Sequence, residues 1–118
     1  MIKYSVCAWL DDLQMSAQLA KLANLYSYDL KFVGDDFAVS ENKVPTVVIV
    51  DLLKLSEEDL NNLLNLSETE YLTIIGYTHQ LKIPQVKFYK EYGCHMVIGR
   101  NDLIKNLNSI LKKIFHAS

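Results

Sequence analysis

The stretch "TVVIVDL" at residues 46–52 decides the fold of this 118-residue chain. Four apolar, β-branched residues (47–50) lead directly into the carboxylate of Asp51. An unbroken apolar run of this kind is typical of a strand in a parallel sheet that helices cover on both faces. Two interpretations of Asp51 follow: it ends the strand and meets water, or its carboxylate takes part in chemistry there.

Strand-like and helix-like segments alternate on both sides of this run. Such alternation predicts an α/β fold, in which right-handed crossovers build a parallel sheet with helices on both faces. For five strands the commonest arrangement is the flavodoxin-like three-layer sandwich with strand order 2-1-3-4-5. The expected strands are 2–10, 29–34, 46–52, 71–78 and 96–99, and the expected helices are 13–26, 56–66, 83–93 and 101–118.

Local signals place the helix ends and one loop. Ser56 is expected to cap the helix that follows it, and Asn101 or Asp102 is expected to cap the last helix. The polar segment 35–44 is too short for a regular helix, and we expect a loop or at most one turn there. The second helix of the sandwich is therefore expected to be short or missing.

Composition limits the classes of function. Half of the residues are hydrophobic and 22% are charged, as in an ordinary globular domain, so we expect one domain over 1–118 and no output domain. The net charge of −2 gives no basic surface for nucleic acid. No apolar run reaches the roughly 18 residues of a membrane helix. Two cysteines, Cys7 and Cys94, make no disulfide framework, which favours a reducing cytoplasm.

Charged and hydroxyl side chains fall at the expected carboxyl ends of the strands. Asp11 and Asp12 follow the first strand and Asp51 ends the third, which are the two strands that flank the crevice in this topology. Clustered carboxylates favour an oxygen-seeking cation such as Mg²⁺, and a carboxylate beside a cation can attack phosphorus. Thr78 ends the fourth strand and Arg100 follows the fifth, where they could stabilise a transferring group.

With these residues in place, the chain resembles the receiver domain of two-component response regulators, the CheY-like family, over essentially its whole length. "VVIVDL" resembles the third strand of the family, which implies that Asp51 is the phosphoacceptor. "IIGYT" resembles the fourth strand and implies that Thr78 is the switch hydroxyl. "GCHMVIGRN" resembles the segment that carries the family's lysine, with Arg100 in its place. The spacing from Thr78 to Arg100 is also the family's.

The sequence departs from the family at several positions. Arg100 keeps the positive charge, but a guanidinium does not replace an ammonium in geometry. Val97 stands where the family has an aromatic switch residue, Asn101 where it has proline, and His79 where it has a small residue. The proline and glycine loop after Asp51 is missing. Together these departures indicate a degenerate site.

The acidic pair in "LDDLQ" leaves several interpretations open. Both Asp11 and Asp12 can be metal ligands together with Asp51. Aligning the following helix by its apolar stripe shifts the pair by one residue, so that Leu10 replaces one acid and the site lacks a ligand. Asp11 and Asp12 can also be no more than the N-terminal cap of the helix. Thr78 likewise can be a strand-end hydroxyl and nothing more.

The resemblance implies a function in signal transduction. We expect an atypical response-regulator receiver domain, not an enzyme, that acts by protein–protein binding and whose Arg100 pairs with Asp51 in an internal salt bridge. The alternative is a working phosphorelay receiver that a histidine kinase phosphorylates on Asp51 with Mg²⁺. The implied partners are a histidine kinase, a phosphotransferase or a downstream target, or a second copy bound through the fourth helix, fifth strand and fifth helix of the family. The four glycines form no nucleotide-binding motif, so no other cofactor is expected.

Overall fold

Five parallel strands form one sheet in the order β2-β1-β3-β4-β5. The structure is a computed structural model and describes residues 4–34 and 44–116. The strand order and the alternation with helices confirm the predicted flavodoxin-like, receiver-like fold. The elements are β1 (Ser5–Trp9), α1 (Leu13–Tyr26), β2 (Asp29–Phe32), β3 (Thr46–Asp51), the 3₁₀ turn η1 (Leu52–Lys54), α2 (Glu57–Ser67), β4 (Leu72–Thr78), α3 (Ile83–Glu91), β5 (Met96–Gly99) and α4 (Arg100–His116).

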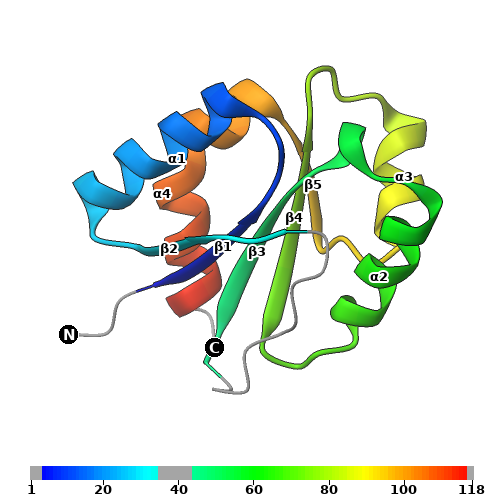
Figure 1. The fold of residues 1–118 in the computed structure, drawn as a ribbon, viewed down its shortest axis with the longest axis horizontal. Helices are drawn as coiled ribbons and strands as arrows, with labels where there is room; N and C mark the ends of the chain where they lie inside the picture. The colour runs from blue at the N-terminus through cyan, green and yellow to red at the C-terminus, as the bar shows by residue number, and fades with distance from the viewer. Residues whose placement is uncertain (1–3, 35–43, 117–118) are drawn as a thin grey trace.

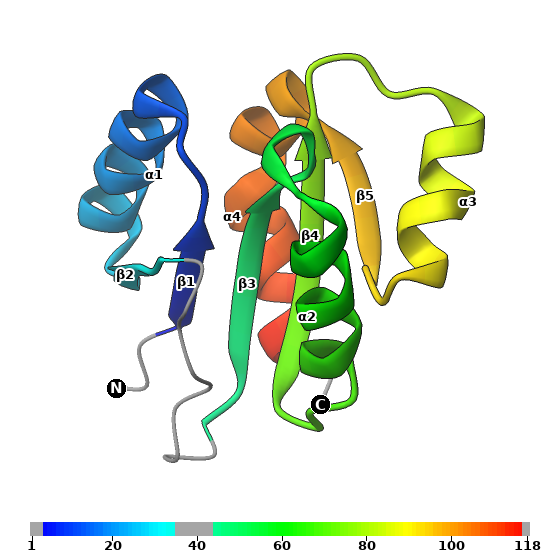
Figure 2. The same ribbon diagram turned by 45° about the vertical axis from the view of Figure 1, so that its right-hand side comes forward.

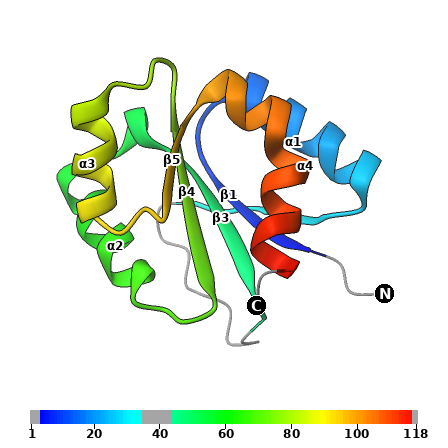
Figure 3. The same cartoon turned by 180° about the vertical axis from the view of Figure 1, so that it is seen from behind.

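The helices form two layers around the sheet. Helices α1 and α4 cover one face and α2 and α3 cover the other (Figure 1). The view from behind shows α4 beside α1 (Figure 3), and these two helices pack against each other. Both faces of the sheet are therefore buried, which explains why β3 is apolar from Val47 to Val50, directly before Asp51.

Strand β3 contributes to both hydrophobic cores. Its residues Val47 and Ile49 face the α1–α4 layer, and Val48 and Val50 face the α2–α3 layer; all four are fully buried. The strands point toward one edge of the sheet (Figure 2), where β1, β3, β4 and β5 end. The register pairs Asp51 with Tyr77 at this edge.

Local sequence signals explain most helix ends. The Asp12 carboxylate caps α1 by accepting the Met15 N–H, and Ser56 and Asp59 form a reciprocal capping box at the start of α2. Pro84 lies in the first turn of α3, and Gly93, with φ of 105°, follows its end. Ser56 is thus confirmed as a cap.

The start of α4 differs from the one expected from the sequence. Helix α4 begins at Arg100, directly after β5, so the predicted cap at Asn101 or Asp102 is wrong: both residues lie inside the first turn. The predicted loop over 35–44, and with it the short or missing second helix, falls almost wholly outside the described residues. Within the described part of the chain, no helix has the length and apolarity needed to cross a membrane.

Candidate functional site

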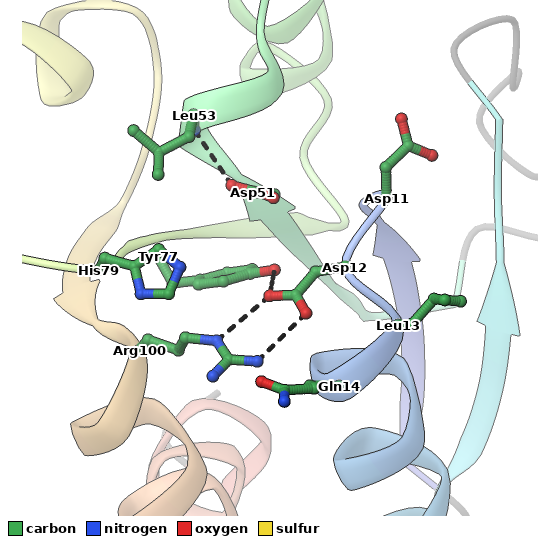
Figure 4. A pocket seen from close by; sticks show the side chains of 9 residues that line it. All are labelled: Asp11, Asp12, Leu13, Gln14, Asp51, Leu53, Tyr77, His79 and Arg100. Atoms are coloured by element: carbon green, nitrogen blue, oxygen red, sulfur yellow. Dashed lines mark hydrogen bonds and ion pairs between the residues drawn. The ribbon is translucent and has the colours of Figure 1, made fainter.

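A pocket of about 420 Å³ opens at the edge where the strands end. Residues from β3, β4 and the starts of α1 and α4 surround it (Figure 4). The topology therefore brings together acids and a cation that lie far apart in the sequence. The lining residues are Asp11, Asp12, Leu13, Gln14, Asp51, Leu53, Tyr77, His79 and Arg100.

The Asp12 carboxylate lies in the middle of a hydrogen-bond network. Arg100 donates from Nε to Oδ2 and from its terminal NH2 to Oδ1, each at 3.1 Å. The Tyr77 hydroxyl donates to Oδ2 at 3.2 Å, and the Met15 N–H donates to Oδ1 at 3.0 Å. Both carboxylate oxygens are therefore engaged by donors from three different elements.

This ion pair is largely shielded from solvent. The side chains of Arg100 and Asp12 are only 13% and 18% exposed. Burial works to raise the pKa of Asp12, but the Met15 N–H and the Arg100 guanidinium outweigh it, and the pKa lies below its ordinary value. A bidentate, charge-assisted pair of this kind is among the stronger polar contacts in proteins.

Asp51 has a different environment in the same pocket. Its side chain is half-buried, and Oδ1 accepts the Leu53 N–H at 3.0 Å (Figure 4). Burial raises the pKa of Asp51 above its ordinary value, and the negative charge of Asp12 adds to this; the Leu53 N–H, His79 and Lys54 act in the opposite direction. The Arg100–Asp51 salt bridge expected from the sequence is wrong, because the guanidinium pairs with Asp12 instead.

Asp11 points away from this network. Its side chain is 84% exposed, and its carboxylate lies 3.8 Å from the Lys54 ammonium. Lys54 in turn lies over the Trp9 ring, 5.4 Å from the ring centroid. Among residues 4–34 and 44–116, no three acidic, histidine or cysteine side chains come together as a metal-binding group. The arrangement of Asp11, Asp12 and Asp51 thus does not fit Mg²⁺ as it stands, and their role as ligands stays a prediction.

Thr78 is absent from the pocket lining. It is 3% exposed, and it follows Ile74 and Gly76 in the alternation of β4, on the side of the α2–α3 layer. Its neighbour Tyr77 packs with the α1–α4 layer and reaches the pocket instead. The role of Thr78 as a switch hydroxyl therefore stays a prediction.

Sequence reasoning did not identify Tyr77 as a site residue. The period of two in a strand gives the signal that could have found it, because Tyr77 alternates with Thr78 and pairs with Asp51. Burial, and then the charges of Asp51 and Asp12, raise the pKa of the Tyr77 hydroxyl, so it remains a hydrogen-bond donor. Its donated bond helps to hold Asp12 beside Arg100.

Comparison with known structures agrees with this topology. The regulatory domain of the master biofilm regulator CsgD matches with a TM-score of 0.72 and 14% identity, over 98% of this chain and 89% of that chain. The chain has a receiver-like fold. A putative pilus assembly protein (cpaE) from Burkholderia thailandensis E264 matches with a TM-score of 0.68 and 15% identity, over 96% of this chain and 98% of that chain. No protein-family model and no curated protein sequence matches the chain.

Proposed function

We propose that this chain is an atypical receiver domain in signal transduction that acts by binding other proteins and not as an enzyme. The observation that carries the proposal is the shielded ion pair between Arg100 and Asp12. In this pair, the only arginine or lysine side chain that lines the pocket in the described part of the chain, Arg100, is bound to one of its acids, Asp12. Arg100 and Asp12 are therefore not available to assist the phosphorylation of Asp51 that the family resemblance implies.

The ion pair is expensive to open. Removing either partner leaves the other charge poorly compensated in a largely shielded place, which costs about 1–3 kcal/mol. Tyr77 and the N-terminus of α1 hold Asp12 in the same position. We therefore propose that the pair is a permanent part of the fold and that the phosphorylation site is degenerate.

Partner binding then depends on the surface of the domain. The face formed by α3, β5 and α4 corresponds to the one that the family resemblance implies, and it carries the exposed side chains Ile83 (86%) and Phe88 (43%). Apolar and aromatic side chains of this kind are common in protein interfaces. A histidine kinase, a phosphotransferase or a downstream target is the proposed class of partner, in the cytoplasm, where Cys7 and Cys94 stay free thiols.

One observation favours a second candidate, a phosphorelay receiver that a histidine kinase phosphorylates on Asp51. Asp51 ends the central strand β3, lines the pocket and has a pKa above its ordinary value. Its environment is thus that of a candidate functional carboxylate. This candidate requires the ion pair of Arg100 and Asp12 to open when a metal ion binds.

A phosphorylation assay separates the two candidates. The chain is incubated with acetyl phosphate and Mg²⁺ and its intact mass is measured, with a receiver domain that accepts phosphate from acetyl phosphate in the same tube as a positive control. We expect the control to gain a phosphoryl group and this chain to keep its mass. A gain of one phosphoryl group that is lost in Asp51→Asn would establish the phosphorelay candidate.

A further inference from the structure

Acidic and basic residues are separated along the second half of the chain. Residues 55–81 contain five acidic residues and no lysine or arginine, whereas residues 82–90 contain three lysines and no acidic residue. The first segment includes α2 and the second most of α3. The fold thus gives one helix a negative surface and the next a positive surface.

These two helices are neighbours in space. Both cover the same face of the sheet (Figures 1 and 2) and pack over the same hydrophobic core. Their C-terminal ends are in contact. Gly93, just after α3, lies so close to Ser67, the last residue of α2, that a Cβ atom added to Gly93 would be 2.4 Å from the Cβ of Ser67. The negative and positive surfaces therefore lie side by side on one face of the molecule, which we name the α2–α3 face.

Within residues 4–34 and 44–116, the charges of the α2–α3 face have no ion-pair partner. In the described part of the chain, no ion pair within 4.0 Å is formed by Lys87 and Lys90 on α3, by Glu57 on α2 or by Glu68, which directly follows α2. Such unpaired charges cost little in water, but they attract an opposite surface that approaches them.

Each helix also exposes an apolar side chain among its charges. A shallow groove of about 530 Å³ on α3 is lined by Ile83, Val86, Lys87, Lys90 and Glu91. Ile83 is 86% exposed there, and Leu64 on α2 is 40% exposed. Glu57 and Leu64 on α2 and its C-cap residue Glu68, which keeps a helical backbone conformation, lie on one stripe because seven and then four residues separate them. Two lysines and one glutamate, Glu91, line the groove, so its net charge is positive and opposite to that of the acidic stripe, and both surfaces carry apolar side chains.

We infer that the α2–α3 face binds a second copy of this chain. A two-fold axis between α2 and α3 lays the acidic helix of each copy on the basic helix of the other, so that one patch complements itself. Leu64 of each copy then contacts the groove on α3 of the other copy, and the glutamates approach Lys87 and Lys90. This dimer uses α2 in place of the β5 and α4 surfaces expected from the sequence. It is independent of whether Asp51 accepts phosphate.

The oligomeric state is measured by sedimentation equilibrium over a range of protein concentrations up to about 100 µM, where a Kd in the micromolar range gives a mostly dimeric protein. We expect a dimer that weakens as NaCl rises from about 0.05 to 0.5 M, because salt screens the attraction. Lys87→Glu with Lys90→Glu is expected to raise Kd at least about tenfold through like-charge contacts. The matched control Lys105→Glu with Lys112→Glu changes the net charge equally on α4 and is expected to leave Kd within about twofold.

A mixture of variants tests the geometry itself. Glu57→Lys with Glu68→Lys is expected to be monomeric alone, like Lys87→Glu with Lys90→Glu, and the two variants mixed are expected to recover a heterodimer with the wild-type Kd. Circular dichroism confirms that each variant is folded. A wild-type protein that stays monomeric, a mixture that does not recover, or an α4 control that weakens the dimer as much as the α3 variant would overturn the inference.

Discussion

The two aspartates of the pocket are held in opposite electrostatic states by their neighbours. Asp12 has a lowered pKa because Met15 and Arg100 stabilise its charged form, whereas burial raises the pKa of Asp51. The charged form of Asp12 therefore stabilises the fold, and the charged form of Asp51 weakens it. The same substitution, aspartate to asparagine, is therefore expected to have opposite effects on the free energy of unfolding at these two positions of one pocket.

At pH 7, Asp12→Asn is expected to lower the free energy of unfolding by about 1–3 kcal/mol. Asparagine keeps the helix cap, so the loss comes from the charge that faces Arg100. Asp51→Asn is expected to raise the free energy of unfolding by less than about 1 kcal/mol, since its side chain is partly exposed to screening water. Urea unfolding of both variants in a buffer with a metal chelator measures these changes.

The pH dependence of the same variants follows from the two pKa directions. The stabilisation from Asp12 is present above the ordinary aspartate pKa and is lost as the pH falls through the lowered one, so the defect of Asp12→Asn shrinks below about pH 4. The carboxyl of Asp51 favours folding below its ordinary pKa and loses this effect as the pH rises through the raised one. The gain of Asp51→Asn therefore vanishes in acid; equal pH profiles for the two variants would contradict this assignment.

Sequence reasoning located the residues of the site better than their contacts. The carboxyl ends of parallel strands meet at one edge, so Asp51, Asp12 and Arg100 could be placed in one pocket from topology alone. Which acid pairs with Arg100 depends on how the start of α1 orients the Asp12 carboxylate, and no sequence pattern encodes this orientation. The sequence prediction named Thr78, whereas its neighbour Tyr77 lines the pocket. Neighbouring residues of a strand point to opposite faces of the sheet, so a difference of one residue changes which side chain reaches the pocket.

At the scale of elements, the pairing of β4 with β5 begins one residue before β5, at His95. The Ile74 N–H donates to Nδ1 of the His95 ring at 2.9 Å, and the His95 N–H donates to the Ile74 carbonyl at 2.9 Å. The backbone register begins with the next pair, Ile75 and Met96. Directly before β5, the His95 imidazole thus accepts the hydrogen bond from the Ile74 N–H that a backbone carbonyl would accept in a regular ladder.

His95→Ala is expected to lower the free energy of unfolding by about 1 kcal/mol, because the Ile74 N–H loses its acceptor. His95→Asn keeps an acceptor oxygen close to the position of Nδ1 and is expected to retain most of the stability. Urea unfolding gives the free energies, and amide hydrogen exchange of Ile74 reports the bond directly. His79→Ala removes an exposed imidazole and serves as the control; an Ile74 amide that exchanges equally slowly in His95→Ala would refute the role of the ring.

Most elements could be read from apolar periodicity, and the exceptions have local causes. Helix α1 occupies 13–26 as predicted, because its apolar stripe and its capping aspartate agree on the same ends. Helix α4 begins without the expected cap because β5 leads directly into it, and Arg100 is both the first helical residue and part of the pocket. A charged side chain of the pocket thus stands at this helix start in place of the usual capping signal.

At the scale of the whole molecule, two cores share one sheet. Leu107 lies in the core under α1 and α4, and Trp9, which is 1% exposed, lies in the core under α2 and α3. Strand β3 has fully buried residues in both cores, so neither layer can separate without exposing apolar surface of the central strand. The charge separation between α2 and α3 also belongs to this scale, since only the fold places the two helices on one face.

The shared strand leads us to expect a single cooperative unfolding transition. Trp9 fluorescence, the methyl resonances of Leu107 and far-UV circular dichroism are expected to give one midpoint, because each core depends on β3. Calorimetry is expected to give an unfolding enthalpy of about 80 kcal/mol near 60 °C for the 118 residues, equal to the van't Hoff value. A Trp9 transition that precedes the Leu107 transition would mean that the α2–α3 layer opens by itself. Measuring at low protein concentration and high salt keeps any dimer from shifting the midpoints, so that an early Trp9 transition reports the fold of one chain.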